Sequence, residues 1–191
     1  MEQEKSTKKI KVTREIFEHN YLGSIALNQL AQARNEQDGH RFRWILPSMA
    51  FSVFRVEAIC NVYGRKLFSH WDHFESTSFI GKITMISEFL KIEVKFSEEP
   101  WQTLNLMKSF RNALAHAKPQ KAFEIHEVAK DFPHKLLPYP KSKKTILSYS
   151  SIENAERFDE VATRLEVMWM HNARVLNFLV DTSGRPEFTE V

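Results

Sequence analysis

The sequence predicts an all-α fold, a helical bundle with an irregular lysine- and proline-rich insertion before its last helix. Three observations lead to this prediction. Glycine is sparse, with 5 in 191 residues, and strand-like alternation of polar and apolar residues is rare. The long segments instead repeat their apolar residues at helical spacing. Four of the seven prolines fall between residues 119 and 140, where that spacing stops.

The first two helices follow from periodicity and from their end signals. One is expected from about Thr13, as its N-cap, to about Gln37. Its apolar residues roughly follow the i, i+3, i+4 rule and are Ile16, Tyr21, Leu22, Ile25, Ala26 and Leu30. The segment NEQDGH then ends it. The second helix, 43–68, is apolar almost all round, which predicts the central helix of the bundle, with Pro47 tolerated only in a first turn.

Three more helices complete the predicted bundle. The third covers about 77–91, and the fourth begins at Pro100, a residue suited to the first helical position, and reaches 117. The insertion, 119–150, is expected to be a long loop with short extended pieces around 122–128 and 145–149. The last helix is expected over 151–180, with Ser151 as its N-cap and Gly184 beyond its end.

Composition limits the class of protein. The length suits one domain, expected over 13–180, with a polar segment at 1–12 and a tail at 181–191. A net charge of +3 argues only weakly for any partner. Cys60 is the single cysteine, so neither an internal disulfide framework nor a cysteine zinc cage is expected. The polar N-terminus and the lack of an apolar run of roughly 20 residues predict a cytoplasmic protein that does not enter a membrane.

The candidate site is the stretch SFRNALAHAKP, residues 109–119. Arginine is always charged and its planar fork fits a phosphate, whereas histidine can act as base or acid near neutral pH. Asparagine can orient either group by hydrogen bonds. Arg111, Asn112 and His116 therefore supply what metal-free cleavage of RNA by its own 2′-hydroxyl requires: a proton acceptor, a proton donor and positive charge at the phosphate.

Spacing places two of these residues together on a helix. Asn112 and His116 are four apart and share a face, whereas Arg111 lies about 140° from His116 around an ideal helix. Its long side chain can reach round, or it can serve a site completed by another subunit. The interval alone is weak evidence, because it recurs at Arg14 to His19 and at Arg65 to His70. A helix end whose cations complement the helix dipole is the structural alternative.

The residues FRNALAHAKP resemble the R-x(4–6)-H signature of the HEPN superfamily, including a polar residue after the arginine. FRVEAICNVYG is similar to that family's long apolar helix with an embedded acid and asparagine. The resemblance covers roughly 13–117 and 151–180, and does not cover the insertion. It implies a HEPN-like bundle that forms a homodimer with the motif helices facing each other.

The resemblance also implies a function, because many members are metal-independent ribonucleases, often toxins or anti-phage defence effectors. Arg111 and His116 would then be catalytic, Asn112 would orient them, RNA would be the substrate, and an antitoxin would be a conceivable partner. No metal or cofactor is expected. Two rivals remain open: the same fold binding RNA or a nucleotide without cutting it, and a structural protein in which the motif organises a helix interface.

Other residues carry weaker hypotheses. Glu57, in the most apolar helix, needs a partner, which is Arg111 or His116 in a site role and Arg55, Lys66 or another helix in a structural one. Asn61 lies four residues after Glu57 on the same helix face and is expected to cap or bridge helices. Cys60 is expected to be a small core residue. The segment HWDH, 70–73, has the ligand interval of a metal site but lacks a third ligand, and a loop rim around Trp71 is the more ordinary interpretation.

The insertion is rich in lysine. Those singled out as candidate RNA-binding residues are Lys118, Lys121, Lys141, Lys143 and Lys144. One interpretation is a solvated linker. The other is an arm that follows phosphates beside the site and gains affinity by counterion release.

Overall fold

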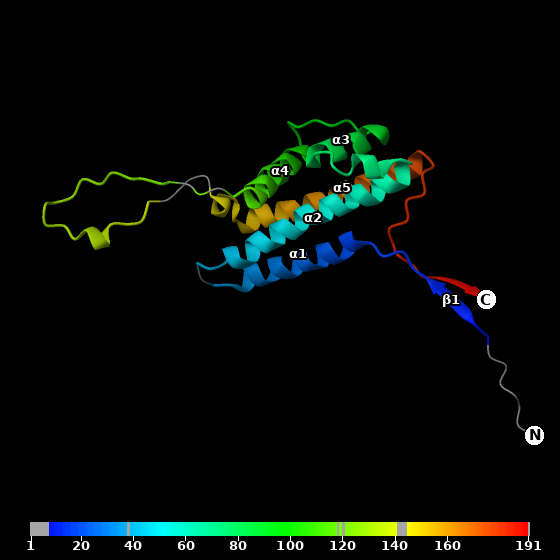
Figure 1. Ribbon diagram of the computed structural model, residues 1–191, viewed down its shortest axis with the longest axis horizontal. Helices are drawn as coiled ribbons and strands as arrows, with labels where there is room; N and C mark the ends of the chain where they lie inside the picture. Colours follow the sequence, from blue (N-terminus) through cyan, green and yellow to red (C-terminus); the bar gives the residue numbers. More distant parts are fainter. Residues whose placement is uncertain (1–7, 38, 118, 120, 141–144, 191) are drawn as a thin grey trace, which may run out of the picture.

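The structure, a computed structural model, describes residues 8–37, 39–117, 119, 121–140 and 145–190. Within them the chain forms a helical bundle, which confirms the all-α prediction. Its helices are α1 (Glu18–Asn35), α2 (Phe42–Leu67), α3 (Phe79–Phe89), α4 (Trp101–Ala115) and α5 (Ile152–Val175). Figure 1 shows α1, α2 and α5 running side by side, with α3 and α4 on one side of them.

The first helix starts later than predicted. Thr13 is not its N-cap but the last residue of a strand, and α1 begins at Glu18. The predicted apolar face is also wrong in part, because Ile16, Tyr21 and Ile25 are exposed. The buried residues of α1 include Ala26 and Leu30, as predicted, and three of the five are glycine or alanine: His19, Gly23, Ala26, Leu30 and Ala33. Small side chains allow α1 to lie close to α2, and a Cβ at Gly23 would come 3.2 Å from the Arg55 side chain.

The two terminal segments, predicted to be a polar segment and a tail, pair with each other. Strand β1 (Ile10–Thr13) runs antiparallel to β2 (Glu187–Glu190), with Ile10 opposite Glu190. Arg14 Nε donates to the Gly184 carbonyl at 2.9 Å, and Gly184 adopts a φ of 61° that favours glycine. Sequence reasoning missed this ribbon because each strand has only four residues and both faces are exposed.

Helix α2 is the central helix, as predicted, and ten of its residues are buried. Pro47 lies beyond the first turn, so the condition placed on it fails, yet the helix continues through it. Within the described residues, α2 is the one helix long and apolar enough to cross a membrane by length and composition. Its packing against the other helices favours the core helix of a soluble bundle.

The remaining helices lie close to their predicted positions. Helix α3 begins after Ser78, whose hydroxyl accepts from the Gly81 N–H, and α5 begins after the predicted cap Ser151, which accepts from the Asn154 N–H. Pro100 is the residue before α4 rather than its first. Helix α5 ends at Val175, earlier than predicted, where Asn177 turns with a φ of 63°.

Aromatic residues fill the core between the helices. Tyr63 and Trp169 meet edge to face at 5.3 Å between ring centroids, and Trp169 Nε1 donates to Ser87 Oγ at 3.0 Å. Trp71 was expected on a loop rim, but it lies in the short 3-10 helix η1 (Trp71–Phe74) and is buried against Gly64. A Cβ at Gly64 would clash with the Trp71 ring. Cys60 is a buried free thiol, which confirms its assignment to the core.

The described parts of the insertion carry little regular structure. They contain two short 3-10 helices, η2 (His134–Leu136) and η3 (Ile146–Tyr149). The second falls where an extended piece was predicted at 145–149, so that prediction is wrong. Residues 121–129 have no assigned helix or strand. Figure 1 shows residues 121–140 projecting away from the bundle, at the end where α4 finishes and α5 starts.

Candidate functional site

Helix α4 positions the candidate residues at its C-terminal end. Arg111 and Asn112 lie in its last turns, and the helix ends at Ala115, so His116 is the first residue after it rather than part of it. The His116 backbone still donates to the Asn112 carbonyl at 3.0 Å, although its φ of −119° has left the helical range. The two residues therefore keep the one-turn separation that the sequence predicts.

Arg111 is paired with Glu57 across the α2–α4 contact. Its Nε lies 2.9 Å from Glu57 Oε1, with 38% of the arginine side chain and 26% of the glutamate side chain exposed. Of the partners considered for Glu57, the structure selects Arg111. Arg55 and Lys66 have other carboxylates, which are Asp159, Glu166 and Glu15.

Asn112 and His116 are both exposed, in contrast to the half-buried Arg111. The arrangement thus gives a cation fixed by a carboxylate, with an amide and an imidazole open to solvent on the same end of α4. The structural rival requires both Arg111 and His116 to be buried and paired, and this holds only for the pairing of Arg111.

Two residues that follow Glu57 on α2 differ in burial: Cys60 lies in the core, and Asn61 is partly buried. Trp71 Nε1 donates to Asn61 Oδ1 at 3.3 Å, which gives Asn61 the bridging role expected of it. Burial raises the pKa of the Cys60 thiol, and the charges of Lys82 and Glu57 act on it in opposite directions. Lys82, a buried lysine of α3, is a cation that sequence reasoning missed, because it lies in an apolar run without a motif around it.

The other candidates separate into those the structure describes and those it does not. Lys121 is exposed, whereas Lys118, Lys141, Lys143 and Lys144 lie outside the described residues. In the described part of the chain, no group of three or more His, Cys, Asp or Glu residues is placed to hold a metal ion. The rings of His70 and His73 lie 6.2 Å apart.

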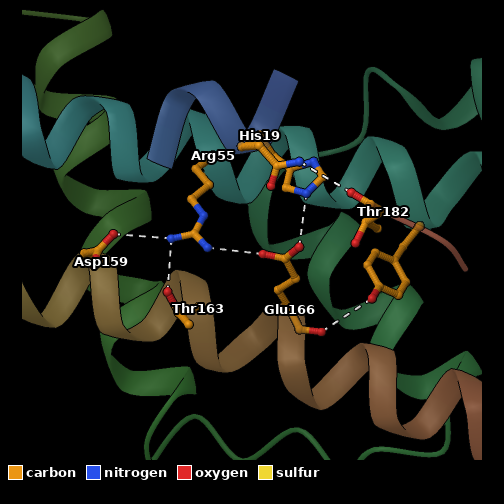
Figure 2. A network of polar contacts seen from close by, with 8 residues as sticks. His19, Arg55, Asp159, Thr163, Glu166 and Thr182 are labelled. Atoms are coloured by element: carbon orange, nitrogen blue, oxygen red, sulfur yellow. Dashed lines mark hydrogen bonds and ion pairs between the residues drawn. The ribbon is translucent and has the colours of Figure 1, made fainter. Parts of the chain in front are cut away.

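A second polar cluster, which sequence reasoning did not single out, lies between α1, α2 and α5 (Figure 2). We call it the Arg55 cluster: Arg55, Asp159, Thr163, Glu166 and His19. Arg55 reaches Asp159 at 3.3 Å, Thr163 Oγ1 at 3.0 Å and Glu166 at 3.2 Å. His19 Nε2 lies 3.0 Å from Glu166 Oε1, although its ring N–H is not aligned for a hydrogen bond.

Burial and charge oppose each other in the Arg55 cluster. Burial alone would raise the pKa of Glu166, but the contacts with His19 and Arg55 outweigh it and hold that pKa below its usual range. For Asp159, burial prevails over Arg55 and raises the pKa. The signal for this cluster was an arginine in the most apolar helix, which requires buried partners. The cluster joins α2 to α5 and α1 to α5 with charged side chains that are mostly buried, while Thr163 at its edge is exposed, so we assign it a role in helix packing.

No protein-family model matches this sequence, and the searches of curated proteins and of solved structures found no match either.

Proposed function

We propose that this chain is a HEPN-like helical domain that acts as a metal-independent endoribonuclease. One observation carries the proposal. At the C-terminal end of α4, Arg111 is ion-paired with Glu57, while Asn112 in the last turns of the helix and His116 just after it are exposed. Cleavage of RNA by its own 2′-hydroxyl needs that combination: a held cation for the phosphate and an accessible imidazole for the proton.

Each residue has a role in the proposed reaction. Arg111 binds the scissile phosphate and stabilises the charge that concentrates on its oxygens in the transition state. His116 accepts the proton of the 2′-hydroxyl or donates one to the leaving 5′-oxygen. Asn112 orients the substrate or the imidazole by hydrogen bonds. Glu57 is a positioning residue, because it acts through Arg111.

The proposed active form is a cytoplasmic homodimer. A single catalytic histidine per chain cannot easily perform both proton transfers of one cleavage. A two-fold axis near α4 would bring two copies of His116 to one phosphate, since the same surface of both subunits forms such an interface. A toxin or a defence effector, held in check by an antitoxin, is the biological role that this activity would suit.

The test is incubation of the purified chain with mixed RNA, with and without EDTA, followed by analysis of the product ends. We expect cleavage that survives EDTA and leaves 2′,3′-cyclic phosphates. Arg111→Ala should reduce the rate by about 10²–10³, the usual effect of removing one charge-stabilising donor. Arg65→Ala is the matched control, because Arg65 starts the same R-x4-H interval on α2 and is also ion-paired, here with Glu75 at 2.8 Å.

The same observation also favours a second candidate, an RNA- or nucleotide-binding module without cleavage. The Glu57 carboxylate neutralises part of the Arg111 charge, as a structural ion pair would. The incubation separates the two functions, since a binding module shifts RNA in a gel and leaves it intact.

A further inference from the structure

Helix α2 presents an aromatic side chain to solvent about one turn before Glu57. Phe54 is 43% exposed, and its ring lies 6.4 Å from that of the partly buried Phe51 in an edge-to-face contact. Neither ring belongs to the hydrophobic core that holds the helices together. The structure therefore holds an aromatic ring at the surface of α2 without using it to pack the bundle.

The C-terminal end of α4 lies toward the start of α2. Phe110 on α4 contacts Tyr149 of η3 at 5.7 Å between ring centroids. Leu147, in the same short helix, lines a cavity with Phe42 and Ile45 from the beginning of α2. Helices α2 and α4 therefore run antiparallel, as Figure 1 shows.

This direction brings Phe54 to the end of α4 that carries the candidate residues. Glu57 Oε1 and Arg111 Nε, 2.9 Å apart, fix the level at which the two helices meet. At the helical rise per residue, Phe54 lies about 4.5 Å from Glu57 along α2. Ala115, the last residue of α4, lies about 6 Å from Arg111 in the same direction. Along the helix axes, Phe54 is thus level with the segment of α4 between Arg111 and His116.

We propose that Phe54 binds RNA by stacking on the nucleobase next to the scissile phosphate. This inference rests on the proposed function, in which Arg111 binds that phosphate and His116 moves the proton. Every nucleobase has a flat face that stacks on an aromatic ring, and such stacking tolerates different sequences. A nucleotide whose phosphate lies at Arg111 has its base within reach of a ring one helical turn away. Phe54 is therefore a substrate-binding residue, which holds the reacting nucleotide in place for the proton transfer.

The proposal also names the form of the substrate. A base that is paired in a duplex has both faces covered by its neighbours and cannot stack on Phe54. Proteins stack aromatic side chains on RNA bases in single-stranded segments, loops and bulges, where unstacked bases can turn outward. The expected substrate is thus unpaired RNA, and the same strand annealed into a duplex should resist cleavage.

The test uses one RNA oligonucleotide whose cleavage position has been mapped, and two abasic versions of it. Each version lacks the base on one side of the scissile phosphate but keeps its ribose and phosphate. Loss of one of these two bases should lower the kcat/KM of the wild type about 5- to 150-fold, the contribution of one base–aromatic stack. Phe54→Ala should lose the same factor on intact RNA and nothing further on that abasic RNA. Phe54→Trp should cleave intact RNA like the wild type.

Phe74→Ala is the matched control. Phe74 is 41% exposed and lies in η1, which follows the other end of α2. This variant should cleave all three oligonucleotides like the wild type. Because Phe54 lies outside the core, Phe54→Ala should melt within a few degrees of the wild type, so that its loss of activity does not report unfolding.

The outcomes separate Phe54 from the proposed function. If Phe54→Ala cleaves intact RNA like the wild type, the stacking proposal is overturned while the ribonuclease stands. If the variant loses the same factor on intact and abasic RNA, Phe54 acts in the fold or in the dimer, and the proposal is overturned as well. Equal cleavage of the duplex and the single strand by the wild type also overturns it.

A wild type that cleaves no RNA removes the proposed function. Gel shifts with an intact strand and a fully abasic strand then decide on stacking alone. A preference for the intact strand that Phe54→Ala reduces supports the stacking, and a preference that this variant leaves unchanged, or no binding at all, overturns it.

Discussion

Replacement of Arg55 by methionine should destabilise the fold strongly. The Arg55 side chain is 13% exposed, and its partners Asp159 and Glu166 are 17% and 18% exposed. Methionine retains most of the apolar stem but removes the guanidinium that lies between the two carboxylates. Breaking a buried ion pair by removing one partner costs about 3–5 kcal/mol, because the remaining charge stays buried without compensation.

This loss of stability converts into a large thermal shift. A chain of 150–250 residues loses about 2–4 °C of melting temperature per kcal/mol, so Arg55→Met should melt roughly 6–20 °C below the wild type at pH 7. Without Arg55 the pKa values of both carboxyl groups rise in the folded state. The folded variant then binds protons more readily than the unfolded chain, so its deficit should shrink as the pH falls.

Differential scanning calorimetry at pH 7 and pH 5 measures both effects. The matched control is Arg34→Met, which breaks the pair with Glu156 at 2.7 Å that joins α1 to the same helix, α5, but at the exposed surface. A surface pair contributes about 0–1 kcal/mol, so this variant should melt within a few degrees of the wild type. If Arg55→Met lowers the melting temperature no more than Arg34→Met does, the Arg55 cluster does not contribute to stability as a buried ion-pair network would.

Three further predictions concern packing, alkali and the insertion. Gly64→Ala places a Cβ against the Trp71 ring and should cost about 1–3 kcal/mol by overpacking, whereas Gly39→Ala, with open space around it, should be neutral in the same melts. Burial, with the charge of Glu166, raises the pKa of Tyr63. The folded state therefore holds that proton more tightly, and stability should fall as the pH rises above about 10. Tyr63→Phe should make this fall of stability with pH shallower, and an equally steep fall in the variant would contradict the prediction. If the lysines of the insertion follow RNA phosphates, replacing Lys141, Lys143 and Lys144 by alanine should lower the log–log salt slope of binding by roughly 0.7 for each phosphate that is no longer bound, and an unchanged slope would assign the segment to a linker.

The helices could be predicted from sequence because their periodicity and caps agree. Ser151 shows this, since a cap residue before a long amphipathic run is a local signal that needs no tertiary information. The start of α1 could not be predicted, because Thr13 looks like a cap and becomes a strand residue only through its pairing with Glu187, far along the chain. Its buried face was misassigned in part, because close packing on α2 buries Gly23 and Ala33, which were not predicted, and leaves the larger Tyr21 and Ile25 exposed.

The candidate site could be predicted in its residue types but only partly in its contacts. Chemistry and spacing identified Arg111 and His116, and the requirement that a carboxylate in an apolar helix find a partner pointed to Glu57. The choice of Arg111 over Arg55 or Lys66 depends on how α4 lies against α2, which no local pattern encodes. The Arg55 cluster depends in the same way on three helices meeting.

The central claim is that His116 moves a proton during RNA cleavage. The single-turnover rate of RNA cleavage, measured at saturating RNA, tests this claim most directly. The measurement compares the wild type, His116→Ala and His70→Ala, the last because His70 ends the same interval on another exposed segment. His116 is exposed beyond the end of α4, so its replacement should leave the melting temperature nearly unchanged. The account predicts that His116→Ala loses at least a hundredfold in rate, in line with the 10²–10⁴ typical of a general acid or base, while His70→Ala cleaves like the wild type. A His116→Ala protein that cleaves at the wild-type rate would contradict it.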